Sequence, residues 1–200
     1  MMFERSESAG FSLIEMLVSV SVLLLVIVGP MTVTSRAAKS SAFASEQVQA
    51  FFLAQEGLEL SQKMRDDLLL RNFLPTAHAN YVANPWYQFT DNSNSGVYRL
   101  CYNGGCGLEW ASDTAIGSPI NCTTITNCKL NFNPTAARSK YTYSTTGTYE
   151  ATPFTRRITF TRVGTNAVEV ISSVTWRTGS IIAEQRVDAQ TYLYNIYATP

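Results

Sequence analysis

The stretch Ser8-Ala-Gly-Phe-Ser-Leu-Ile-Glu-Met-Leu-Val18 decides how this chain is interpreted, because it places one carboxylate at the start of a long apolar run. Glu15 is the only formally charged side chain between Glu7 and Arg36. Residues 11–33 are mostly Leu, Val, Ile, Met and Phe, and as a helix they would span about 34 Å, enough to cross a hydrocarbon core of about 30 Å. A carboxylate in a spanning helix costs about 2.5–3.5 kcal/mol on insertion scales, so Glu15 implies a partner.

Two simple explanations of such a run are a cleaved secretory signal and an ordinary single-pass membrane anchor. A secretory signal begins with a basic segment and places small residues after its apolar core. Here Glu4 and Glu7 outnumber Arg5, and the small residues Ala9 and Gly10 precede the apolar run. The order is therefore the reverse of a secretory signal, and an ordinary anchor leaves the carboxylate unexplained.

A cut between Gly10 and Phe11 would supply the partner that Glu15 needs. The new α-amine of Phe11 would be a cation at the helix start, and a carboxylate on the first turn could neutralise it in the same chain or in a neighbouring one. At these residues the chain resembles the type IV pilin and type II secretion pseudopilin superfamily, through Gly10-Phe-Ser-Leu-Ile-Glu15 and the apolar helix after it.

The resemblance implies how the chain would be processed and where it would reside. A membrane prepilin peptidase and N-methyltransferase would cleave after Gly10 and methylate Phe11, the apolar helices would pack into a filament core, and Glu15 would neutralise the amine of an adjacent subunit. The chain would lie in the bacterial cytoplasmic membrane before assembly, and afterwards in an extracellular filament or a periplasm-spanning pseudopilus, with its folded part outside the cytoplasm. One departure is the leader, since the family usually carries basic residues before the glycine and here Arg5 alone does so.

Gly29 and Pro30 also resemble the helix-weakening pair of many pilins. Pro30 deletes a backbone donor and clashes one turn back, so it permits a kink or local melting. A simple helix end at this point is the alternative.

After Arg36 the composition shifts to Ala, Ser, Gln and Glu with spaced apolar residues, and no proline follows Pro30 until Pro75. This pattern predicts one continuous helix over about residues 11–72, roughly 93 Å long. The expected organisation is a leader (1–10), a transmembrane or filament-core helix (11–35), an amphipathic second half (36–73), a cysteine-containing loop region (74–153) and a C-terminal antiparallel β-meander (154–200). The helix charges expected to be solvated or to contact neighbours are Glu46, Glu56, Glu59, Lys63 and Arg65.

Within the loop region, residues 97–102 predict a strand and Asn103-Gly-Gly105 a tight turn. Its four cysteines are Cys101, Cys106, Cys122 and Cys128. An exported segment favours an oxidising compartment and two disulfides, for which the sequence leaves three connectivities open. The local pairs Cys101 with Cys106 and Cys122 with Cys128 are expected.

Beyond Pro153 the apolar pattern changes to a period of two, with turns near residues 164–166 and 178–179. This predicts three antiparallel strands with one apolar face, which the amphipathic half of the helix would cover. The predicted fold class is therefore α+β, a long N-terminal helix packed against an antiparallel sheet. The runs 154–160, 174–176 and 191–195 resemble the C-terminal sheet of minor pilins of the PilV-like kind.

Other candidate sites have simpler explanations. The cysteine spacings are looser than those of usual zinc sites, and the run Asp91–Gly96 lacks the acidic twelfth residue of a calcium loop, so no metal or cofactor is expected. His78 is the only histidine and no nucleophile or metal-ligand motif accompanies it, so the chain is not expected to be an enzyme. The candidate basic stripe for nucleic acid comprises Arg156, Arg157, Arg162 and Arg177. A solvated sheet surface is favoured for these arginines, because strand alternation separates two of them.

These observations favour a structural subunit, a minor pilin of a type IV pilus-like filament, whose partners are other pilins. A type II secretion pseudopilin and a membrane-anchored surface or DNA-binding module that does not polymerise are the alternatives. The sequence does not separate pilus from pseudopilus.

Overall fold

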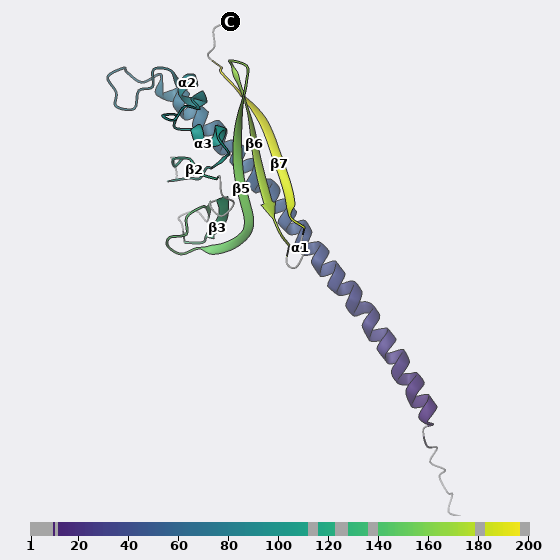
Figure 1. Cartoon of the computed structure of the whole chain (residues 1–200). Coiled ribbons are helices and arrows are strands. Elements are labelled where there is room, and N and C mark those ends of the chain that lie inside the picture. Colours follow the sequence, from purple (N-terminus) through teal and green to yellow (C-terminus); the bar gives the residue numbers. More distant parts are fainter. Residues whose placement is uncertain are drawn as a thin grey trace, which may run out of the picture. The chain divides into compact units, whose positions relative to one another are not determined.

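The computed structural model shows an α+β chain (Figure 1). It describes residues 10, 12–111, 116–122, 128–135, 140–178 and 183–196. The chain divides into two compact units, residues 1–44 and residues 45–200. The second of these is called the folded unit below.

Residues 13–44 of the first unit are helical. Helix α1 covers Leu13–Arg71, a length of 59 residues, and therefore belongs to both units. The predicted long helix is confirmed, while Phe11, at its expected start, lies outside the described residues. The alternative of a helix end at Gly29-Pro30 is wrong, because α1 passes through Pro30 without interruption.

The folded unit holds an antiparallel sheet in which β5 is the shared strand. The strands are β1 (Cys106–Gly107), β2 (Ile120–Asn121), β3 (Lys129–Asn133), β4 (Lys140–Thr142), β5 (Glu150–Val163), β6 (Ala167–Trp176) and β7 (Gln185–Tyr194). One edge of β5 pairs with β6, which pairs with β7, and the other edge pairs with β1 and β3. The predicted antiparallel sheet is confirmed, and β5, β6 and β7 form its C-terminal meander.

The first strand of the meander starts earlier than the predicted boundary at residue 154. Strand β5 begins at Glu150 and includes Pro153, although proline has no N–H to donate to a ladder. Pairing with β6 starts only at Thr155, and pairing with β3 is irregular between Lys129 and Asn131. Pro153 is tolerated because it lies beyond the β6 ladder and beside this irregularity.

The region predicted as loop, residues 74–153, contains two short helices besides β1 to β4 and the start of β5. They are α2 (Pro85–Thr90) and α3 (Arg99–Tyr102). The strand predicted over residues 97–102 is therefore wrong. The buried residues here are Tyr98 and Cys101, three positions apart, which is the spacing of a helical turn and not the period of two of a strand.

The core of the folded unit lies between the second half of α1 and one face of the meander (Figure 1). The buried positions of α1 recur at helical spacing and are Ala50, Leu53, Ala54, Gly57, Leu60, Ser61, Met64, Arg65, Leu68 and Leu69. Helix and sheet approach closely at Gly57, where a Cβ would stand 3.1 Å from the Cβ of Ser172 and 3.2 Å from Cδ1 of Ile158. A glycine at this position therefore sets the spacing between α1 and β6.

Candidate functional site

The processing motif lies at the start of α1. Gly10 is exposed, and a Cβ added to it would meet no atom within 4 Å, so the fold does not require glycine there. Phe11 lies outside the described residues. Glu15 is in the first turn of α1, where a carboxylate interacts favourably with the helix dipole. It is exposed and makes no ion pair with any described residue.

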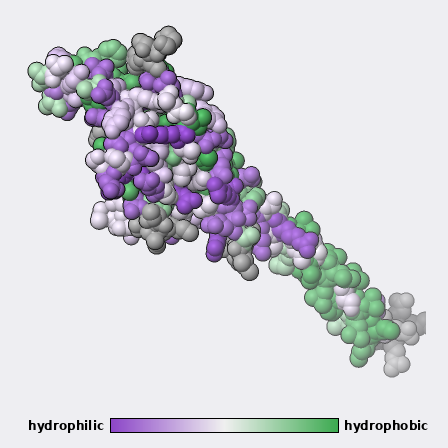
Figure 2. Space-filling view, turned by 45° about the horizontal axis from the view of Figure 1, so that its top comes forward, coloured by the Kyte–Doolittle hydropathy of each residue, from purple (hydrophilic) through white to green (hydrophobic). Residues whose placement is uncertain are grey.

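The helix surface that follows Glu15 is apolar and uncovered. Every large apolar side chain from Leu13 to Val33 is at least 48% exposed. Figure 2 shows this segment as a nearly continuous hydrophobic surface. Among the described residues, α1 is the one helix long and apolar enough to cross a membrane, judged by length and composition. So large an apolar surface requires lipid or other apolar helices to cover it.

Several hydroxyl groups near and within this segment donate to carbonyls of their own helix. The side chain of Ser21 donates to the carbonyl of Leu17, and that of Thr32 to the carbonyl of Gly29, each at 2.8 Å. Such bonds suit a helix surrounded by hydrocarbon, where no water satisfies polar groups. Pro30 breaks the pattern, since it leaves the carbonyl of Val26 without its usual backbone donor. The kink predicted at Gly29-Pro30 stays a prediction, and the missing backbone donor of Pro30 is the physical reason to expect it there.

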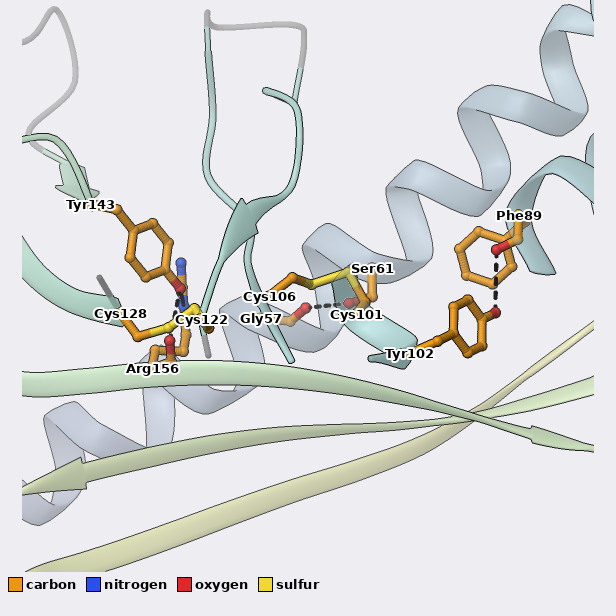
Figure 3. Close-up of a disulfide and its surroundings, with 10 residues drawn as sticks. All are labelled: Gly57, Ser61, Phe89, Cys101, Tyr102, Cys106, Cys122, Cys128, Tyr143 and Arg156. Carbon is orange, nitrogen blue, oxygen red and sulfur yellow. Dashed lines mark hydrogen bonds between the residues drawn. A yellow bond between two sulfur atoms is a disulfide. The ribbon is translucent and has the colours of Figure 1, made fainter. Parts of the chain in front are cut away.

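A buried arginine joins α1 to the sheet in the folded unit. Arg156 of β5 is 0% exposed. Its Nη1 donates to the Glu56 carboxylate at 2.5 Å and to the Leu53 carbonyl at 3.1 Å, and its Nη2 donates to the Leu108 carbonyl at 2.8 Å. Its Nε donates to the Tyr143 hydroxyl at 3.0 Å (Figure 3). A buried charge is tolerated only when it is paired and hydrogen-bonded, and Arg156 meets both conditions.

This network also affects the ionisation of its members. Burial raises the pKa of the Tyr143 hydroxyl. Burial by itself would lower the pKa of Arg156, but the neighbouring Tyr143 and Glu56 reverse this and raise it. Arg156 is therefore charged at neutral pH, and its hydrogen bonds join α1 to β5.

The arginines considered as a basic stripe do not form one. The prediction of a solvated surface is wrong for Arg156, because this residue shares the inward parity of Phe154 and Ile158 in β5. Arg157 is exposed on the opposite face, and Arg162 donates from its guanidinium to the carbonyl of Thr90. Arg156, as a charged residue, was predicted to be solvated. Its position on the apolar face of a strand, two residues from Phe154 and from Ile158, was the sequence feature that indicated burial.

Three of the helix charges predicted to be solvated or to contact neighbours are bonded to distant parts of the folded unit. Glu46 accepts a hydrogen bond from the Thr178 hydroxyl. Arg65 is only 9% exposed and donates from Nη1 to the Tyr194 carbonyl at 3.3 Å. Glu56 is the partner of Arg156. Lys63 pairs with Asp67 one turn further along the same helix, at 3.0 Å. The second half of α1 is therefore fixed to the sheet by polar contacts as well as by apolar packing.

All four cysteines are in disulfides, Cys101 with Cys106 and Cys122 with Cys128. Their Cα atoms are 4.5 and 5.3 Å apart, within the usual range for disulfides. Figure 3 shows the Cys101–Cys106 bond close to α1 at Gly57 and Ser61. Because no cysteine is free, a zinc site would have no thiolate ligands.

The remaining candidates have local partners. Asp91 Oδ1 accepts a hydrogen bond from the N–H of Ser93 at 2.9 Å, and hydrogen bonds from Ser93 lower the pKa of Asp91, so its carboxylate serves the turn. His78 is exposed, and its Nδ1 accepts from the N–H of Asn80 at 3.1 Å. Within the described ranges, no group of three His, Cys, Asp or Glu residues could hold a metal ion.

Comparison with known families gives a match to the prokaryotic N-terminal methylation motif over residues 5–29. The chain carries a prepilin-type N-terminal segment. This match supports the type IV pilin and pseudopilin superfamily, and the long helix packed against an antiparallel sheet is the type IV pilin fold. The motif and the apolar helix together support membrane anchoring before assembly. No curated protein and no solved structure matches the chain.

Proposed function

We propose that this chain is a structural subunit, a minor pilin, of a type IV pilus-like filament. The observation that carries the proposal is the placement of Glu15, a lone carboxylate at the start of an exposed apolar helix and five residues after Gly10 in the matched motif. Cleavage between Gly10 and Phe11 creates an α-amine four residues, about one helical turn, before Glu15. Neutralisation of that amine by Glu15 lowers the cost of removing both charges from water as helices pack.

The rest of the chain has a role in this proposal. The leader, residues 1–10, is removed, and residues 11–35 span the membrane before assembly and contact other pilins afterwards. Removal of the leader takes one Arg and two Glu from the 15 basic and 15 acidic side chains, which leaves 14 and 13. The mature chain is thus nearly neutral, so its partners are selected by shape and local contacts. Its disulfides suit an oxidising compartment outside the cytoplasm.

We propose a minor subunit and not a major one, because the folded unit is long and complex. A major pilin, whose identical copies build most of the filament, needs less. The superfamily of the matched motif is structural, which supports a subunit over an enzyme. The second candidate is a type II secretion pseudopilin, favoured by the same motif and helix. Imaging of surface filaments in a strain that lacks this chain distinguishes the two. The number of filaments should fall or change if the chain is a pilin, and should stay the same if it is a pseudopilin.

The test of the proposal combines mass spectrometry with assembly. The wild-type chain is expected to have a methylated Phe11 at its mature terminus, whereas an anchored module that does not polymerise keeps residues 1–10. Glu15→Ala should be inserted and cleaved normally, because the Gly10-Phe11 bond is intact, yet its content in sheared filaments should fall at least tenfold. Glu59→Ala is the matched control, since Glu59 is exposed on the same helix and makes no ion pair with a described residue.

Two results contradict the proposal. An unprocessed terminus would exclude the pilin pathway altogether. Normal incorporation of the Glu15→Ala variant would exclude charge neutralisation as the reason for the carboxylate.

A further inference from the structure

The outer face of the meander, turned away from α1, carries a pocket of about 300 Å³. Small-molecule pockets range from about 300 to 1,000 Å³, so this one admits a single small unit and not a large ligand. Its described lining combines two arginines, one glutamate, three hydroxyl side chains and a wall formed by the Cys122–Cys128 disulfide. None of these side chains belongs to the N-terminal helix.

The strand register builds this pocket. Residues paired directly across strands point to the same face of a sheet. The row Thr155, Thr175 and Arg186 lies next to the row Arg157, Ser173 and Asp188. Both rows lie opposite the inward face that buries Arg156 and Val174. Three consecutive strands therefore bring the two guanidinium groups to one place on the outer face.

One of the two guanidinium groups is held in place by the sheet. Arg186 donates from Nε to Oδ1 of Asp188 at 2.8 Å and from Nη2 to Oγ of Ser173 at 3.1 Å. Ser173 is only 8% exposed. Burial opposes ionisation of Asp188, but hydrogen bonds from Arg186 and Ser173 outweigh it and lower the pKa of this carboxyl. Arg186 is thus fixed, with its charge largely compensated.

The other guanidinium group is free to bind. The Cγ and Cδ atoms of Arg157 lie beside Gly105, where a Cβ would come within 2.6 and 2.7 Å of them. Gly105 has a φ of +100°, a conformation that glycine adopts readily, so the backbone gives room to the aliphatic part of Arg157. Within the described part of the chain, Arg157 makes no ion pair. Its charge therefore faces the pocket without a protein partner.

The lining specifies the ligand by its charges and hydrogen-bonding groups. Asp188 compensates the charge of Arg186, so Arg157 is the guanidinium of the described lining that is available to an anion, and one such group suits a single carboxylate. The hydroxyls of Thr155 and Thr175 both donate and accept, and Glu184 accepts, whereas the Ser173 hydroxyl is already engaged by Arg186 and Asp188. A ligand with one carboxylate and several hydroxyls satisfies Arg157, the two threonine hydroxyls and Glu184. We propose that this pocket binds a uronic acid unit of an acidic saccharide.

Calorimetric titration of the full chain in detergent micelles tests the proposal, with D-glucuronate, D-glucose and inorganic phosphate as separate probes. Glucuronate is expected to bind at one site, and glucose, which lacks the carboxylate, at least tenfold more weakly. Arg157→Gln keeps a long polar side chain and should weaken glucuronate binding by at least tenfold, as charge-assisted hydrogen bonds require. Arg99→Gln is the matched control, since Arg99 is also exposed but lies outside the pocket.

Each outcome of these titrations decides the proposal. Arg157 is exposed, so its variant should fold, and unchanged tryptophan fluorescence would verify this. Equal glucuronate affinity in the wild type and Arg157→Gln would overturn the site. Binding of phosphate as tightly as glucuronate would make the pocket a general oxyanion site and overturn the saccharide assignment. Absence of any glucuronate binding to the wild type would also overturn the saccharide assignment.

Discussion

Replacement of Gly57 by alanine tests whether the close approach of α1 to the sheet is under steric control. Alanine is favoured over glycine in a helix by about 0.8–1.0 kcal/mol. Against this, the new methyl group would lie 3.1 Å from Cβ of Ser172 and 3.2 Å from Cδ1 of Ile158, and closer still to the Ser172 hydroxyl. Overpacking of a core costs about 1–3 kcal/mol, so the clash outweighs the helix preference and a net loss of about 1 kcal/mol is expected.

A second substitution turns this into a test of sign. Ser172→Gly removes both of the atoms of residue 172 that the methyl group would approach. In that background Gly57→Ala should stabilise the protein by up to about 1 kcal/mol, because the helix preference then opposes only the contact with Cδ1 of Ile158 at 3.2 Å, which a small shift of that side chain relieves. The two changes should therefore show a coupling free energy of about 1–2 kcal/mol, which is expected for residues in contact.

Urea unfolding of the full chain in detergent micelles, followed by tryptophan fluorescence, provides the measurement. The three tryptophans are Trp86, Trp110 and Trp176, all in the folded unit, so they report its unfolding and not that of residues 12–44. A shift of the midpoint at constant slope gives the change in the free energy of unfolding. If Gly57→Ala raised the midpoint equally in both backgrounds, the contact with Ser172 would not limit helix–sheet spacing and the reasoning would be refuted.

Two further predictions concern the polar core. Glu56→Gln should lower the free energy of unfolding by about 1–3 kcal/mol in the same assay, because it leaves the buried Arg156 without a counter-charge; the figure is below that of a fully buried pair since Glu56 is 30% exposed. Glu59→Gln should change the free energy of unfolding by less than about 0.5 kcal/mol. Equal effects of Glu56→Gln and Glu59→Gln would show that the Arg156–Glu56 pair does not hold α1 to β5. Burial raises the pKa of Tyr98, Tyr102 and Tyr143 above the ordinary value of 10.0. The stability that these groups contribute is fully present below pH 10.0 and is lost as the pH rises through their folded pKa values. The part of the near-ultraviolet tyrosinate absorbance that Tyr143→Phe removes should therefore appear together with unfolding, and its appearance before the fluorescence change would show that Tyr143 is accessible.

The sequence predicted the parts of this protein whose signal is local. The apolar run and Glu15 identify the N-terminal helix without reference to any other residue, since length and polarity alone decide whether a helix can cross a membrane. The period of two beyond Pro153 predicted the meander for a similar reason, because alternate residues of a strand must face the core. The long α1, free of proline from residue 31 to its end, follows from composition.

The tertiary structure decided what depends on partners far apart in the chain. Strands β1 to β4 have two to five residues each, too few to show a period, and exist because they pair directly or through one another with β5. Arg156 is inside because Glu56, 100 residues earlier, reaches it from α1, and no local pattern encodes that pairing. The outer pocket likewise requires the register of three strands. Local hydrophobicity selects helix or strand, but only packing determines which distant group satisfies a buried charge or leaves an exposed one free to bind.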